Sequence, residues 1–169
     1  MKTRRETLAS LAAAAAAAGC ARPADWCASP QYTDDGAFPY PDDCAVTADD
    51  IEGPYYLADA PERADMNLYG DAGTPLTLSG RVFDGDCGTP IAGAIVELWQ
   101  ADPDGKYDNS SDEMRYRCMV STDSDGAYFV STLLPGRYLN GSVFRPRHIH
   151  VKVFDASGAE RLTTQLYFE

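Results

Sequence analysis

Histidine and basic residues are scarce in this sequence. Only two of its 169 residues are histidines, and 14 Lys and Arg stand against 26 Asp and Glu, for a formal net charge of −12. Because an acidic chain repels phosphate backbones, no nucleic-acid partner is expected. The sequence also lacks a long apolar run: residues 8–19 are too few to span a bilayer.

The N-terminus is typical of a cleavable export signal. A basic cluster ending in Arg4 and Arg5 precedes the apolar stretch, which closes with small residues. The paired arginines resemble a bacterial twin-arginine signal, and "AAGC", ending at Cys20, resembles a lipoprotein cleavage site. We therefore expect residues 1–19 to direct export to the bacterial periplasm or cell envelope, with Cys20 as a candidate lipid anchor. The alternative is cleavage without lipidation and release of a soluble protein.

The cysteines are not spaced for a metal site. No Cys-x-x-Cys pair occurs among the five, which argues against a thiolate-bound metal. Apart from Cys20, four cysteines remain, and an even number in an exported chain favours disulfides. Four cysteines allow three pairings, of which the most local is expected. That pairing links Cys27 to Cys44 and Cys87 to Cys118.

The body of the chain has the pattern of an antiparallel β-sandwich. Residues 20–50 are rich in Pro and Asp without periodicity and are expected to form an irregular tether. From residue 76 onward, short segments of alternating or apolar character are separated by Gly- and Pro-containing turns, about ten residues apart. No segment after residue 20 has a convincing helical period. The expected fold is all-β, with strands within 76–84, 94–101, 127–134, 147–155 and 161–169.

The two histidines lie on one predicted strand as His148-Ile-His150. Side chains alternate along a strand, so both imidazoles face the same side, with Cα atoms about 6.5–7 Å apart. Such a pair can converge on one metal ion, although a polar stripe on a solvated face is the alternative. With no third histidine, oxygen ligands must complete a site, and Tyr107 and Tyr138 are candidates because phenolate suits a ferric ion. The alternative for each tyrosine is packing on the core.

Several separated motifs resemble the intradiol ring-cleavage dioxygenases. These are "GTPIAGAIVELWQADPDGKYDN", "STDSDGAYFVSTLLPGRYLN", "FRPRHIHVKV" and "LTTQLYFE", in that order, with "EGPYYL" ahead of them. The resemblance runs from about Asp50 to Glu169. It implies that residues 51–169 form the β-sandwich core of that family, and that the chain is an exported bacterial member.

The resemblance also implies a cofactor, a substrate and roles for individual residues. The cofactor is non-haem Fe(3+), and the substrates are a catechol-type diol and O2, which give a muconate-type diacid. Tyr138 is expected to leave the metal and accept a substrate proton, Arg145 to stabilise developing negative charge, and Gln165 to act or orient ligands nearby. A homo-oligomer is compatible with the sequence. The implied metal ligands are Tyr107, Tyr138, His148 and His150.

Two other functions are compatible with parts of the pattern. Turns such as "DSDGAYFV" and "LPGRY" also occur in transthyretin-like sandwiches, which predicts an exported binding module without a metal. A metal site used for iron storage, or one that has lost its activity, is the second alternative. The sequence does not choose among individual catechols.

Overall fold

The computed structural model describes residues 45–169, and within them every regular element is a β-strand. This confirms the predicted all-β class. No helix in the described part of the chain is long and apolar enough to cross a membrane. The predicted export signal and most of the predicted tether lie outside the described residues. The strands are β1 (Pro75–Arg81), β2 (Ile95–Gln100), β3 (Arg117–Ser121), β4 (Ala127–Leu133), β5 (Tyr138–Asn140), β6 (Val143–Arg145), β7 (Arg147–Phe154) and β8 (Glu160–Phe168).

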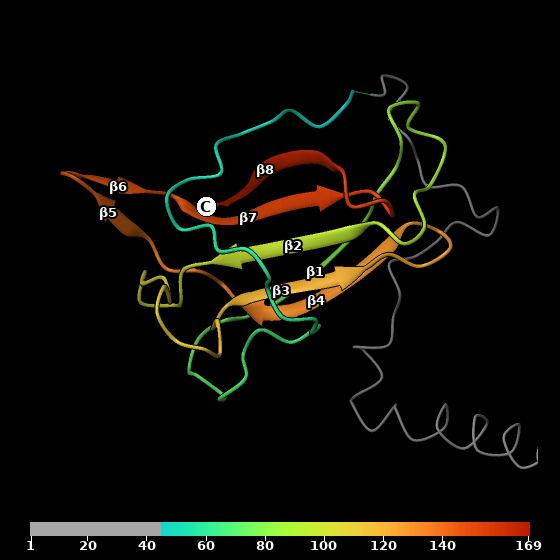
Figure 1. Ribbon diagram of the computed structural model, residues 1–169. Coiled ribbons are helices and arrows are strands. Elements are labelled where there is room, and N and C mark those ends of the chain that lie inside the picture. Colours follow the sequence, from blue (N-terminus) through green and yellow to red (C-terminus); the bar gives the residue numbers. More distant parts are fainter. Residues whose placement is uncertain (1–44) are drawn as a thin grey trace, which may run out of the picture. The chain divides into compact units, whose positions relative to one another are not determined.

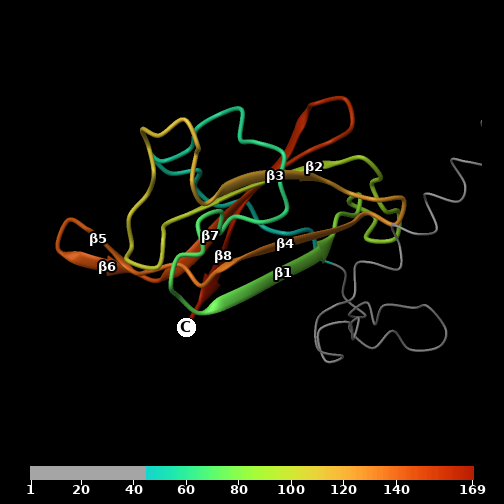
Figure 2. The ribbon, with the colours of Figure 1, turned by 90° about the horizontal axis from the view of Figure 1, so that it is seen from below.

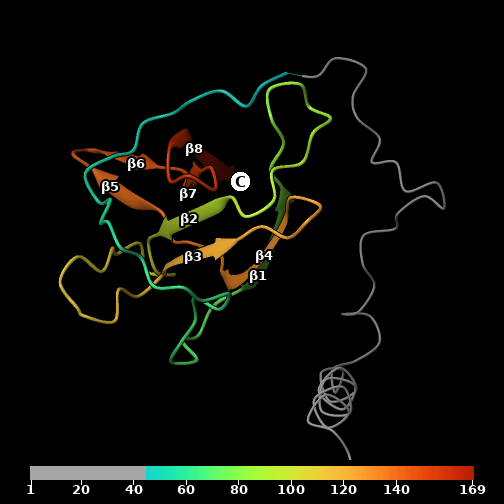
Figure 3. The same cartoon turned by 45° about the vertical axis from the view of Figure 1, so that its right-hand side comes forward.

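Three antiparallel sheets make up the unit that contains these strands (Figure 1). The largest has the order β3-β2-β7-β8, β1 pairs with β4, and β5 pairs with β6. Figures 2 and 3 show β1 and β4 as a second layer beside the four-stranded sheet. The predicted sandwich is therefore confirmed, and the β5–β6 hairpin extends from one end of it (Figure 1).

The core lies between these two layers. Val96, Leu98, Ile149 and Val151 project from the central strands β2 and β7, and they pack in one cluster with Val130 of β4. Alternation along β2 and β7 then places the intervening side chains on the opposite, outer face of the four-stranded sheet. That face carries both histidines.

The outer face is covered by the segment 48–57, which crosses it (Figure 1, cyan). The amide of Asp50 donates to the carbonyl oxygen of Thr163 on β8 at 2.8 Å, and Glu52 forms an ion pair with Lys152 of β7. We call residues 48–57 the strap. Because the strap covers it, nearly all of β7 is buried on both faces.

The predicted link between Cys87 and Cys118 is wrong. Cys118 is a free thiol, fully buried in β3 opposite Leu98, whereas Cys87 is disulfide-bonded. Strand alternation points Cys118 into the core, while Cys87 occupies a loop with a φ of 55°. The pairing was predicted from closeness in the sequence, which carries no information about the direction of the two side chains. The predicted link from Cys27 to Cys44 lies outside the described residues.

Candidate metal centre

Strand β7 buries both histidines on the outer face of the sheet, with 2% of each residue exposed. Nδ1 of His148 lies 2.7 Å from the carbonyl oxygen of Pro146, which can only accept a hydrogen bond. The proton of the neutral ring is therefore on Nδ1, and the lone pair of Nε2 faces away from the backbone. A fixed tautomer of this kind is usual for a metal-binding histidine.

The ring of His150 is in close contact with Trp99 and with the backbone at Gly53. It stacks on the indole of Trp99, with 4.7 Å between ring centroids and 5° between planes. The strap backbone passes close to the ring as well, because a Cβ at Gly53 would lie 3.3 Å from Cε1 of His150. The Nε2 atom points at the Tyr107 hydroxyl, 3.2 Å away, whereas the buried Nδ1 has no hydrogen-bond partner among the described residues.

Two glycines bring the two predicted tyrosine ligands together. Gly105 and Gly136 each stand two residues before a tyrosine, and their backbones are in direct contact. A Cβ at Gly136 would lie 2.3 Å from the amide nitrogen of Gly105, and one at Gly105, whose φ is +82°, would lie 2.2 Å from the carbonyl oxygen of Arg137. Only glycine permits this crossing. The Tyr107 and Tyr138 rings then meet edge to face at 5.5 Å.

Three of the predicted ligand atoms converge on one another. The Tyr107 hydroxyl lies 3.3 Å from Nε2 of His148 and 3.2 Å from Nε2 of His150. Donor atoms that share one ion at about 2.0–2.1 Å lie roughly 2.9–3.4 Å apart. The Tyr138 ring is 5.5 Å from the His148 ring. All four predicted ligand side chains are therefore neighbours, although the assignment of each as a ligand stays a prediction.

Burial keeps these four side chains neutral in the absence of a metal. It lowers the pKa of His150 to about 3 and the pKa of His148 below its usual value, so both imidazoles hold free lone pairs. Burial also raises the pKa of Tyr107 and of Tyr138. A cation bound here must therefore displace phenol protons, as metals do when they bind thiols.

The donor set fits a hard, highly charged metal ion. No group of three His, Cys, Asp or Glu side chains that could hold a metal occurs in the described part of the chain, so a site at β7 depends on phenolate oxygen. Two anionic phenolates with two imidazoles suit Fe(III) better than a soft or divalent ion. The side chains present thus fit non-haem ferric iron.

Arg145 and Gln165, the other two predicted site residues, are bound to each other. Arg145 of β6 lies opposite Tyr138 of β5, and its Nη2 donates to Oε1 of Gln165 at 2.8 Å. Gln165, which lies opposite His150 in the β7–β8 pairing, donates in turn to the carbonyl oxygen of Ile51 at 2.8 Å. This arrangement shows Gln165 holding the guanidinium of Arg145 and the strap in place.

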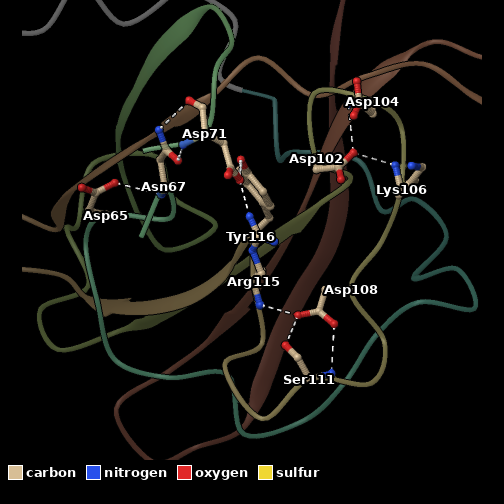
Figure 4. A network of polar contacts seen from close by, with 10 residues as sticks. All are labelled: Asp65, Asn67, Asp71, Asp102, Asp104, Lys106, Asp108, Ser111, Arg115 and Tyr116. Atoms are coloured by element: carbon tan, nitrogen blue, oxygen red, sulfur yellow. Dashed lines mark hydrogen bonds and ion pairs between the residues drawn. The ribbon is translucent and has the colours of Figure 1, made fainter. Parts of the chain in front are cut away.

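The loop after Tyr107 is closed by its own polar groups (Figure 4). The carboxylate of Asp108 accepts hydrogen bonds from the hydroxyl of Ser111 and from the amide of Arg115. The Arg115 side chain pairs with Asp71, which also accepts from the Tyr116 hydroxyl at 2.7 Å. The hydrogen bonds to the Asp108 carboxylate, whose donor in Arg115 is the backbone amide, fix the chain immediately beyond Tyr107.

Sequence reasoning missed several residues that contact the predicted ligands. Trp99 could have been found, because it stands two residues after Glu97 on β2 and so lies on the same, outer face of the sheet. That face also carries the histidines, and Trp99 lies opposite His150. Tyr55, whose ring stacks on Tyr107 at 4.2 Å, lies in "EGPYYL", but nothing in that motif indicated the contact. Arg117 gave no signal in the sequence, because its contacts are with Tyr55 of the strap and with the loop residues Asp108 and Asn109.

A family model described as "Dioxygenase" matches residues 51–169. Chlorocatechol 1,2-dioxygenase from Pseudomonas sp. (strain P51) is 36% identical over 138 residues, which are 70% of this chain and 54% of that protein. The chain spans about half the length of the curated relatives it matches.

Solved structures are similar over the same region. One is the dioxygenase domain of a dioxygenase carbohydrate-binding protein fusion from the cellulolytic bacterium Streptomyces sp. SirexAA-E. It is 41% identical with a TM-score of 0.65, covering 73% of this chain and 75% of that one. Catechol 1,2-dioxygenase from Pseudomonas arvilla C-1 is 34% identical with a TM-score of 0.63, covering 71% and 45%.

Proposed function

The chain belongs to the intradiol ring-cleavage dioxygenase family, and from this we propose that it inserts both atoms of O2 into a catechol-type diol. The expected product is a muconate-type diacid. The observation that carries the proposal is the convergence of the Tyr107 hydroxyl on both histidine Nε2 atoms. Family membership favours this enzyme over the non-catalytic transthyretin-like module.

The family uses non-haem iron, and we propose Tyr107, Tyr138, His148 and His150 as the side chains that hold it here. A bound ferric ion supplies a Lewis acid for the two diol oxygens and a path for electron density from the ring to O2. The four side chains supply the shape of the site. The backing of His150 by Trp99 and Gly53 keeps that shape fixed.

Tyr138 is suited to accept a proton from the substrate. A catechol that binds through both oxygens loses two protons, and a phenolate at Tyr138 Oη can take one of them. Tyr138 starts a three-residue strand that pairs only with β6, whereas Tyr107 is stacked under Tyr55 and followed by the closed loop. Of the two tyrosines, Tyr138 therefore has more freedom to move during the reaction.

Arg145 is placed to stabilise negative charge that develops on the substrate. Its guanidinium is permanently cationic, lies directly across the hairpin from Tyr138, and is held by Gln165. We propose that Gln165 acts by orienting Arg145.

Isotope labelling tests the proposed reaction. Iron-loaded protein incubated with catechol under ¹⁸O2 should give a diacid that carries both labelled atoms. His148→Ala and His150→Ala should abolish the product, because the chain has no other imidazole. An unlabelled product, a ring-opened aldehyde, or no product from iron-replete protein would contradict the proposal.

We also propose that the protein acts after export, anchored by a lipid on Cys20. The basis is the sequence of residues 1–20, which lie outside the described residues. Expression with Arg4→Lys and Arg5→Lys should leave the protein in the cytoplasm, and Cys20→Ala should release it from the membrane fraction. Equal distribution of all variants would contradict the proposal. Measuring the molecular mass of the purified protein in solution tests whether it forms a homo-oligomer.

A further inference from the structure

Arg117 is a charged side chain buried beside the candidate metal centre. Arg117 is the first residue of β3, and only 1% of it is exposed. It is the largest fully buried side chain in the described part of the chain. Its guanidinium donates to carbonyl and amide oxygens, not to a carboxylate. No acidic side chain of the described part of the chain forms an ion pair with it.

The hydrogen bonds of Arg117 join the pieces of backbone that surround Tyr107. Nη1 donates to the carbonyl oxygen of Tyr55 at 2.7 Å, and Nη2 donates to the carbonyl oxygen of Asp108 at 2.8 Å and to Oδ1 of Asn109 at 3.0 Å. Tyr55 provides the ring that stacks on Tyr107, and Asp108 is the next residue in the chain. One guanidinium therefore connects the strap to the loop that follows Tyr107.

A buried cation is costly unless negative charge lies nearby. The carboxylate of Asp108 is one source, but its oxygens are already bonded to Ser111 and to backbone amides. Tyr107 directly precedes Asp108, whose carbonyl oxygen accepts a hydrogen bond from Arg117, so a phenolate at Tyr107 places a second negative charge close to the guanidinium.

We infer that Arg117 is a positioning residue for Tyr107, and that its positive charge stabilises this side chain as the phenolate that binds iron. The inference rests on the proposed function, since it concerns the same site. It goes further by assigning control of the phenolate's donor strength to a residue that contacts neither metal nor substrate. A nearby cation lowers the energy of the phenolate electrons and weakens their donation to the metal.

The visible spectrum of the resting ferric protein tests this without any turnover. In Arg117→Met the phenolate-to-iron charge-transfer band should move to longer wavelength, because loss of the cation raises the energy of the donor electrons. Iron affinity should fall about 10–100-fold, the usual effect of losing a group that orients a ligand. Arg117→Lys keeps the charge and should leave the band near its original position.

Arg115→Met is the matched control. It removes a guanidinium two residues away whose side chain forms a half-exposed ion pair with Asp71, and the band should not move. Asn109→Asp provides a second variant that keeps Arg117 and places a carboxylate against it. The band should again shift to longer wavelength, which tests the charge even if Arg117→Met fails to fold.

The outcomes separate this inference from the proposed function. If the unmodified protein binds no iron and shows no charge-transfer band, the proposed metal site is wrong. If it shows the band, and neither Arg117→Met nor Asn109→Asp shifts it relative to Arg115→Met, the role of Arg117 is wrong while the metal site stands. A shift of equal size in Arg115→Met would also overturn the inference, because it would show a general effect of surface charge.

Discussion

At the scale of single residues, the two site tyrosines differ in how firmly they are held. Tyr107 is stacked by Tyr55, followed by a closed loop and hydrogen-bonded to both histidines, whereas Tyr138 lies on a short hairpin beside Arg145. We therefore expect the two identical side chains to have different roles. The first prediction follows from this difference.

Tyr138→Phe should retain much of the iron but lose the proposed proton acceptor. Ring cleavage should fall by a factor of about 10²–10⁴, the usual value of acid–base assistance. Tyr107→Phe should instead lose most of the iron, because its hydroxyl is the atom that both histidines approach. Iron content and rate of diacid formation, measured for both variants, check the assignment. Full activity in Tyr138→Phe would show that it is not the proton acceptor.

Cys118 should be chemically inert in the folded protein. Burial raises the pKa of its thiol to about 12, and only the thiolate reacts with alkylating reagents. Iodoacetamide at about pH 8 should label Cys118 only after denaturation, as read by peptide mass. Rapid labelling of the native protein would mean that β3 opens readily.

Sequence reasoning at this scale succeeded where a pattern encodes direction. The His-x-His spacing correctly predicted that both histidines lie on the same face of one strand. The motif resemblance named Tyr107 and Tyr138, which the fold does bring together. It failed for Cys87 and Cys118, whose directions depend on a loop conformation and on strand parity. It also missed Arg117 and Tyr55, because they meet only when the strap folds across the sheet.

At the scale of elements, the centre depends on the crossing of two glycine loops. Gly105 and Gly136 place Tyr107 and Tyr138 at the end of the sandwich, next to the start of β7. The sequence predicted Gly- and Pro-containing turns between the strands, among them "LPGRY", which contains Gly136. It did not predict that the turns touch, since contact between distant loops has no local signature.

Gly136→Ala should therefore damage both stability and the metal centre. Its Cβ would meet backbone atoms at 2.3 and 2.5 Å, so the crossing must open, at a cost of about 3 kcal/mol, the upper end for overpacking. Iron content should fall with it. Gly85→Ala is the control, because a Cβ there has nothing within 4 Å. Denaturant unfolding of both variants gives the comparison, and equal stabilities would contradict the crossing.

At the scale of the whole molecule, many aspartates of this acidic chain stabilise turns. Hydrogen bonds from the side chain and amide of Thr89 and from the amide of Gly88 lower the pKa of Asp86 to about 2. The Tyr116 hydroxyl holds the pKa of Asp71 below its usual range, and the Ser157 hydroxyl does the same for Asp155. Because these pKa values are lower when folded, the stabilisation is present above pH 3.8 and disappears as the pH falls towards 2.

The metal-free protein should therefore melt at progressively lower temperature as the pH falls from 3.8 towards 2. Using metal-free protein separates this effect from loss of iron. Asp86→Asn should be less stable at neutral pH and should depend less on pH in the acid range. A melting temperature that is constant across this range would contradict the assignment.

The central claim is that two phenolates and two imidazoles form a ferric site, and metal analysis with a visible spectrum tests it most directly. Protein loaded anaerobically with ferrous iron and then oxidised in air should contain about one iron per chain. It should be red to brown, because phenolate-to-Fe(III) charge transfer absorbs visible light. Folded protein that stays colourless and metal-free after this treatment would contradict the account.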